Sequence, residues 1–172
     1  MQLSYDTDYP IGLEGQLIED YPHATITGIC EAAGMQVGKL AIFDTTSGRA
    51  DKSVRAVAAT GDVTSTNLVA GLVLLDPTFP FQSGFGSPSA ASIYPQNRTC
   101  PILRRGRILL ASETVLSKAF RPFVRFASGS GTVLGSIRND ADTATAVAAP
   151  YLEVITPATA AGGLVVVEIN LG

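Results

Sequence analysis

Short apolar runs, separated by Gly, Pro, Ser, Thr and Asp, recur along this chain. Residues 24–30 alternate small or polar side chains with apolar ones, which is typical of a strand that buries one face. Residues 68–75 are apolar throughout, which predicts a strand covered on both faces. Further strands are predicted at residues 38–44, 54–59, 99–103, 107–111, 123–126, 132–137, 151–155 and 164–169, whereas residues 144–149 are ambiguous and residues 115–120 fit a short helix or a loop. This spacing of strands and turns predicts an all-β fold, either a compact β-barrel or a jelly-roll-like sandwich.

Two segments lack the strand pattern. Residues 1–20 contain an Asp-Tyr-Pro sequence and glycines that disfavour a helix, so we expect an extended N-terminal arm before a single domain over residues 21–172. Residues 76–98 are rich in Pro, Gly and Ser, and a loop of this length is uncommon inside a compact domain. This loop is either a mobile flap or a segment that a partner orders. Its aromatic residues favour the partner, because exposed aromatic side chains are costly unless something covers them.

Composition narrows the function classes. Charged residues make up 16% of the 172 residues, against about 25% in typical globular domains, which suggests that partners hide some of the surface. The net charge of −3 provides no basic field for a phosphate backbone, so nucleic-acid binding is not expected. Acidic residues interrupt any apolar core of a secretion signal near the N-terminus, and no apolar run is long enough to span a membrane.

The residues that usually carry chemistry are few. Cys30 and Cys100 could form at most one bridge, and free buried thiols are the favoured interpretation for a chain kept in the cytoplasm. No cysteine or histidine pair has zinc-ligand spacing, and His23 lacks a nucleophile elbow, so we expect it at the surface or in a capping role. Residues 139–143 have the alternating oxygens of a calcium loop without its glycine, which favours a polar turn, and residues 129–135 fit a hairpin turn better than a phosphate loop. We therefore predict no catalytic residues, no metal and no cofactor.

One basic cluster interrupts the predicted strands at residues 99–103 and 107–111. It consists of Arg104, Arg105 and Arg107, and the glycine between them predicts a bend or a bulge. The cluster is either a solvated turn or an anchor for an acidic partner surface, since guanidinium groups bind carboxylates in pairs of hydrogen bonds.

Motifs along nearly the whole chain resemble the structural cement proteins of tailed bacteriophages. The opening Pro10-x-Gly12-x-x-Gly15, followed by a Thr/Ile strand and Gly-Lys-Leu-Ala-Ile-Phe, is similar to the start of that family. Residues 69–75 resemble the family's central strand, residues 105–110 the strand after it, and residues 161–169 its closing strand. The resemblance implies a small β-barrel-like body without catalytic residues.

The resemblance also implies a function, that of a capsid decoration protein. It would be made in the host bacterial cytoplasm, bind the exterior of an assembled virion head as a homotrimer near local three-fold positions, and bridge neighbouring major capsid protein subunits. We expect the arm and the long loop to make the inter-subunit contacts, together with the basic cluster. The candidate contact residues are Tyr5, Tyr9, Ile11, Leu13, Phe79, Phe81, Phe85, Arg104, Arg105 and Arg107.

Three other readings remain open on the sequence alone. Another virion part, such as a minor head or tail β-protein, is the first alternative. A carbohydrate-binding sandwich is the second, although the chain has no Trp and its tyrosines would have to stack on the sugar. An enzyme is the third alternative. It ranks last because the candidate acids, bases and nucleophiles form no recognisable arrangement.

Overall fold

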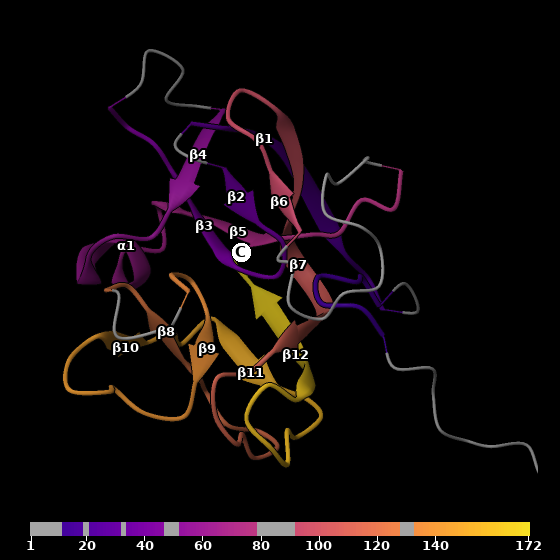
Figure 1. Cartoon of the computed structure of the whole chain (residues 1–172), viewed down its shortest axis with the longest axis vertical. Coiled ribbons are helices and arrows are strands. Elements are labelled where there is room, and N and C mark those ends of the chain that lie inside the picture. The colour runs from indigo at the N-terminus through magenta and orange to yellow at the C-terminus, as the bar shows by residue number, and fades with distance from the viewer. Residues whose placement is uncertain (1–11, 19–20, 32–33, 47–51, 79–91, 128–132) are drawn as a thin grey trace, which may run out of the picture.

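The computed structural model describes residues 12–18, 21–31, 34–46, 52–78, 92–127 and 133–172. Strands dominate these ranges, and the prediction of an all-β fold is confirmed (Figure 1). The elements are β1 (Ala24–Cys30), β2 (Met35–Gln36), β3 (Leu40–Phe43), β4 (Ser53–Ala56), α1 (Thr60–Thr64), β5 (Val69–Val73), β6 (Ile93–Tyr94), β7 (Thr99–Ala111), β8 (Phe123–Arg125), β9 (Ile137–Arg138), β10 (Ala146–Ala148), β11 (Leu152–Val154) and β12 (Leu164–Asn170). Within the described ranges, no helix has the length and apolar character needed to cross a membrane.

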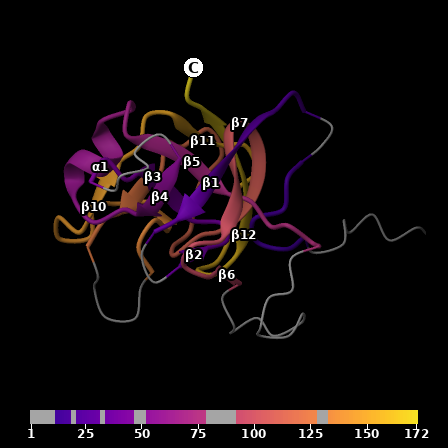
Figure 2. The same ribbon diagram turned by 90° about the horizontal axis from the view of Figure 1, so that it is seen from above.

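The main sheet closes into a barrel. Its strands follow the order β1-β4-β3-β5-β7-β12-β11, and β1 also pairs with β7, so the strands from β1 to β7 form a ring. The β1–β4 pairing is parallel and short, and the other pairings of the ring are antiparallel. A smaller sheet, β10-β8-β9, lies below the ring in Figure 1, on the side of β11 and β12. Figure 2 shows β7 and β12 together along one side of the molecule.

β7 organises the sheet, because its 13 residues pair with three other strands. Ala24 of β1 lies opposite Arg105 and Thr25 lies opposite Leu103, so Arg104 has no opposite residue on β1. The predicted bend or bulge is therefore a bulge, and the two strands predicted on either side of it are one strand. Gly106 follows the bulge with φ +131°, a backbone conformation that L side chains rarely adopt.

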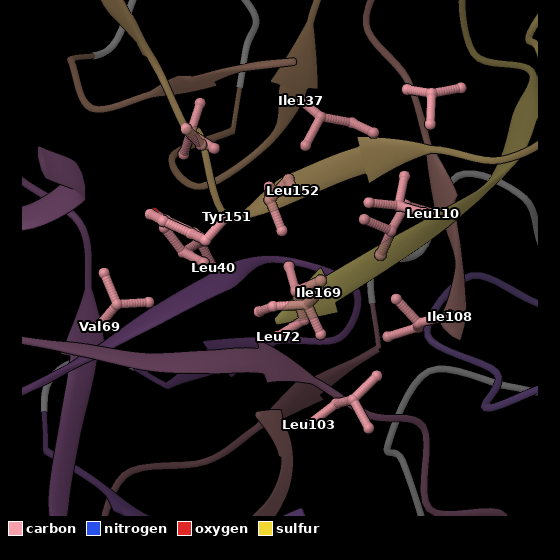
Figure 3. Close-up of a cluster of buried hydrophobic side chains, with 14 of the residues drawn as sticks. Leu40, Val69, Leu72, Leu103, Ile108, Leu110, Ile137, Tyr151, Leu152 and Ile169 are labelled. Carbon is pink, nitrogen blue, oxygen red and sulfur yellow. The ribbon is translucent and has the colours of Figure 1, made fainter. Parts of the chain in front are cut away.

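Two apolar clusters cover the two faces of the barrel wall. The large cluster joins the wall to β11, β12 and the smaller sheet (Figure 3) and includes Leu40, Ile42, Leu72, Leu103, Ile108, Leu110, Ile137, Leu152 and Ile169. The small cluster consists of Cys30, Met35, Val37, Ala41, Val54, Ala70, Val73, Tyr94, Cys100 and Ile102. β5 contributes Val69 and Leu72 to the first and Ala70 and Val73 to the second, as its unbroken apolar run predicts.

Some predicted elements differ from the structure. The strand predicted at residues 132–137 is wrong over its described part, because Leu134 and Gly135 form a turn and the strand β9 begins only at Ile137. Gly135 has φ +82°, and its carbonyl accepts a hydrogen bond from the N–H of Leu40. Residues 115–120 form a loop, which Leu116 attaches to Ala158 through an isolated bridge. The pattern analysis did not predict α1, β2 or β6.

Candidate functional site

Residues 12–18, which we call the strap, lie along β7 as an additional strand-like segment. The N–H of Gly15 donates to the carbonyl of Leu109 (2.7 Å), and the N–H of Leu109 donates to the carbonyl of Gln16 (3.0 Å). The N–H of Ile18 donates to the carbonyl of Arg107 (2.9 Å). These hydrogen bonds cover the part of β7 that lies beyond its pairing with β1. The strap therefore belongs to the sheet, whereas the division of the chain into residues 1–20 and 21–172 stays a prediction.

The glycines of the opening motif let the strap approach the body closely. A Cβ atom on Gly12 would overlap the side chain of Leu109. Gly15 has φ +83°, and a Cβ atom on it would overlap the side chain of Val37. The spacing Pro10-x-Gly12-x-x-Gly15 thus has a steric reason at both glycines.

A largely buried ion pair attaches the strap to the turn between β2 and β3. The ammonium of Lys39 lies 2.6 Å from a carboxylate oxygen of Glu14, with the two side chains 7% and 28% exposed. Gly38, at φ +76°, lies beneath the Glu14 side chain and leaves it room. Because water reaches this pair poorly, the charges interact more strongly than an exposed pair would.

The strap meets both ends of the predicted long loop. The carbonyl of Gly15 accepts a hydrogen bond from the N–H of Leu75 (2.8 Å), where the loop begins. Val37, which packs on Gly15, donates its N–H to the carbonyl of Ser92 (2.9 Å), directly before β6. Because β6 lies within residues 76–98, the loop ends earlier than predicted. We call this place, formed by Gly15, Val37, Leu75 and Ser92, the junction.

Tyr94 fixes the same two loop ends to each other. Its hydroxyl donates to the carbonyl of Leu74 (3.0 Å) and accepts from the N–H of Asp76 (2.8 Å). Burial raises the pKa of Tyr94, so the hydroxyl stays protonated and remains a donor. The described residues on each side of positions 79–91 are therefore held at one point of the body.

The predicted contact residues lie partly within and partly outside the described ranges. Six of them lie outside the described residues, namely Tyr5, Tyr9, Ile11, Phe79, Phe81 and Phe85. Leu13 lies on the strap with 53% of its surface exposed, although it is apolar.

The arginines of the basic cluster lie in three different environments. Arg107 donates from Nε to Glu168 (3.0 Å), and its guanidinium carbon lies 4.0 Å from the centroid of the Tyr21 ring. Arg104 extends over the ring of Phe43, at 5.9 Å from the centroid. Arg105 is exposed and has no ion pair within the described ranges. The interpretation as a solvated turn is wrong, because the ladder of β7 continues through these residues.

An ionic network that the sequence analysis missed joins β8 to two loops. Arg125, whose side chain is 1% exposed, donates three hydrogen bonds to Glu113 (2.8, 2.9 and 3.0 Å) and one to Asp142 (2.6 Å). Arg138 also contacts Asp142 (2.7 Å) and reaches Asp140 (2.7 Å). Hydrogen bonding to Glu113 raises the pKa of Arg125, and hydrogen bonding from Arg125 lowers the pKa of Asp142. No periodicity or motif connects these positions in the sequence.

The segment at residues 139–143 is a polar turn within this network. Asp142, Thr143 and Ala144 all have positive φ, between 41° and 64°. The carboxylates of Asp140 and Asp142 form ion pairs with arginines. They therefore do not present the row of free oxygens that a calcium loop offers. His23 is exposed, and its Nδ1 atom lies 3.3 Å from the carbonyl oxygen of Tyr21, which agrees with a surface role.

Comparisons with known proteins give one family and several structural neighbours, two of which are described below. The family model described as structural cement protein (E217 gp24/Pam3 gp6) matches residues 1–170. A chain from the capsid of Myoviridae phage XM1 superposes with a TM-score of 0.69 and 13% identity, over 99% of this chain and 97% of that one. The head fibre gp8.5 N base of bacteriophage phi29 superposes with a TM-score of 0.44 and 10% identity, over 88% of this chain and 97% of that one. No sequence among the curated proteins matches.

Proposed function

The chain belongs to the family of structural cement proteins, and from this premise we propose that it binds the outside of an assembled phage head and clamps neighbouring major capsid protein subunits. The match over residues 1–170 carries the proposal, because it spans nearly the whole chain. Membership implies a structural, non-enzymatic role in the phage capsid. The similarity in fold to a chain of a phage capsid supports the same conclusion.

The physical basis of the clamp is preferential binding to the assembled shell. A protein that binds neighbouring subunits only in their assembled geometry stabilises that geometry by mass action. We propose that three copies act together as a homotrimer near local three-fold positions. Linked weak contacts then give high avidity, because each further contact forms at a high effective concentration.

The junction supports the proposal that the arm and the long loop contact the coat together. The strap leads directly from residues 1–11, and the junction also holds both ends of the loop. Contacts made by either segment are therefore transmitted to the same rigid part of the barrel. Leu13 and Arg105 are the described contact candidates, since Arg104 and Arg107 already contact Phe43, Tyr21 and Glu168.

A reconstruction of the phage shell with and without this protein tests the proposal. We expect additional density on the outside of the shell, bridging neighbouring coat subunits at three-fold positions. Intact heads that carry no additional density after incubation with excess protein would refute the cement role. Density at two-fold or six-fold positions would refute the trimer and retain the clamp.

Variants can then test the contact residues separately. Deletion of residues 1–11 leaves the strap and its ion pair in place, so reduced occupancy on shells reports on the arm and not on the fold. Undiminished occupancy would remove the arm from the proposal. For the basic cluster, Arg105→Ala should weaken binding to the shell, whereas Arg121→Ala, at another exposed arginine, should not. Equal effects of the two substitutions would exclude Arg105 as a specific anchor.

A further inference from the structure

The two cysteines of the chain are neighbours in the barrel wall. Cys30 ends β1, and Cys100 is the second residue of β7. Gly28 lies opposite Cys100, and the N–H of Cys30 donates to the carbonyl of Arg98 (2.9 Å). The two thiols therefore lie diagonally on one face of the β1–β7 ladder, and both belong to the small cluster.

Both thiols are buried in the small cluster at the closure of the ring. Each cysteine has 0% of its surface exposed, and neither is in a disulfide. The β1–β7 pairing closes the barrel, and on the other side of β1 only Ile29 and Cys30 pair with β4. This end of β1 thus depends on a few hydrogen bonds, and a covalent bond there would add to them.

We propose that Cys30 and Cys100 form an oxidisable dithiol, which a peroxide converts into a disulfide that links β1 to β7. This inference goes beyond the role at the capsid and does not depend on it. The thiols are the state of the protein under reducing conditions, and the disulfide is its state under oxidising conditions.

The reaction balances with one peroxide for each chain. The sulfur of Cys30 attacks a peroxide oxygen, the O–O bond breaks, and water leaves to give a sulfenic acid. The sulfur of Cys100 then attacks the sulfur of Cys30, the S–O bond breaks, and the thiol proton of Cys100 leaves with the hydroxide as a second water. The two thiols are equally buried, and the balance and the product are the same if Cys100 attacks the peroxide first.

Burial decides which oxidants can react. Peroxide is small enough to enter when the end of β1 opens locally, and strand ends open at a lower free-energy cost than the middle of a sheet. Bulky thiol reagents should react much more slowly with the folded protein. The disulfide would close a loop of roughly 70 residues and raise the melting temperature by about 5–15 °C, the range depending on strain.

Oxidation of the full chain with hydrogen peroxide tests the inference. We expect the monomer to lose the mass of two hydrogen atoms, to keep no alkylatable thiol after denaturation, and to melt at a higher temperature that a reducing agent reverses. Cys100→Ala should instead gain oxygen on Cys30 or remain unchanged, and its melting temperature should not rise with peroxide. Cys30→Ala provides the reciprocal control.

Three results would overturn the proposal. The first is two titratable thiols remaining after treatment that oxidises an exposed thiol in the same tube. The second is a gain of oxygen without the loss of hydrogen, which would mean that the thiols oxidise independently. The third is an intramolecular disulfide that forms without a rise in melting temperature, because the bond would then not reinforce the barrel.

Discussion

Removing the carboxylate of Glu14 should destabilise the protein through a charge left behind, not through the contact that is lost. In Glu14→Ala, the ammonium of Lys39 keeps its place in a site where only 7% of its side chain is exposed. Breaking a fully buried pair costs about 3–5 kcal/mol, and an exposed pair is worth about 0–1 kcal/mol. The carboxylate of Glu14 is 28% exposed, so water screens the pair from one side. We therefore expect the free energy of unfolding to fall by about 1.5–3 kcal/mol, which lies between these limits.

Urea denaturation measures this change directly. With an m value of about 2 kcal/mol/M, the midpoint should shift down by about 0.8–1.5 M. The double variant Glu14→Ala/Lys39→Met is the decisive comparison, because it removes the stranded charge and keeps an unbranched side chain in the site. It should recover at least half of the lost stability, since replacing both partners of a buried pair by apolar groups is often close to neutral.

Amide exchange shows whether the strap itself is released. The N–H groups of Gly15 and Ile18, which donate to β7, should lose protection in Glu14→Ala, whereas those in the centre of β12 should keep it. A destabilisation below about 0.5 kcal/mol would place the pair among ordinary surface ion pairs and refute the reasoning. So would a double variant less stable than Glu14→Ala.

Three further predictions follow from the same structure. The pKa of Asp142 lies below the ordinary value of 3.8 in the folded protein. The ionised carboxylate therefore stabilises the folded protein above that pH, and this contribution is lost as the pH falls through the folded pKa. The melting temperature of Asp142→Asn should accordingly decline less steeply with acid than that of the unaltered protein. Gly71→Ala, at φ +141° with its Cβ against the carbonyl of Leu103, should cost about 3 kcal/mol or more in urea denaturation, whereas Gly162→Ala, at φ +77° in open space, should cost about 1–2 kcal/mol. Tyr94→Phe should cost about 1–3 kcal/mol and expose the amide of Asp76 to exchange, because its hydroxyl bonds two backbone groups; unchanged exchange at Asp76 would refute that role.

The strands with a strong periodic or apolar signal were predictable from the sequence. Residues 24–30 form β1 as predicted, and the apolar run at residues 68–75 contains β5, with both faces buried. The closing run at residues 164–169 forms β12 with one additional residue. In each case the burial of alternate or successive side chains selects the same conformation that local preference favours.

The short elements were not predictable, because tertiary contacts determine them. α1 has five residues, one of them a glycine, and the carboxylate of Asp62 stabilises its start by accepting the N–H groups of Ala58 and Ala59 and pairing with Arg55. A helix this short has no apolar period to recognise. β2 and β6 have two residues each and pair with each other, although they lie far apart in the sequence.

The candidate site was likewise only partly predictable from the sequence. The glycine spacing of the strap was visible, but its reason, the contact with Leu109 and Val37, requires the fold. The basic cluster was visible as composition, yet only the register of β7 with β12 shows that Arg107 is paired with Glu168 and that Arg105 is free of ion pairs in the described ranges. The sequence alone therefore does not show which arginine of the cluster pairs within the protein and which is left for contact with a partner; that distinction requires the alignment of the strands.

The arrangement around β7 would let the strap distribute a mechanical load over the barrel if the proposed arm binds the coat. A force applied to residues 1–11 reaches the barrel through the strap, whose hydrogen bonds with β7 run between Gly15 and Ile18. β7 in turn pairs with β1, β5 and β12, so the load spreads over several ladders instead of pulling on one turn. The Glu14–Lys39 pair resists sliding of the strap along β7, because sliding would separate the two charges in a poorly hydrated site. If the arm binds the coat, Glu14→Ala should therefore weaken shell binding even at temperatures where the barrel stays folded, and equal binding by the folded variant would show that the strap does not carry the load.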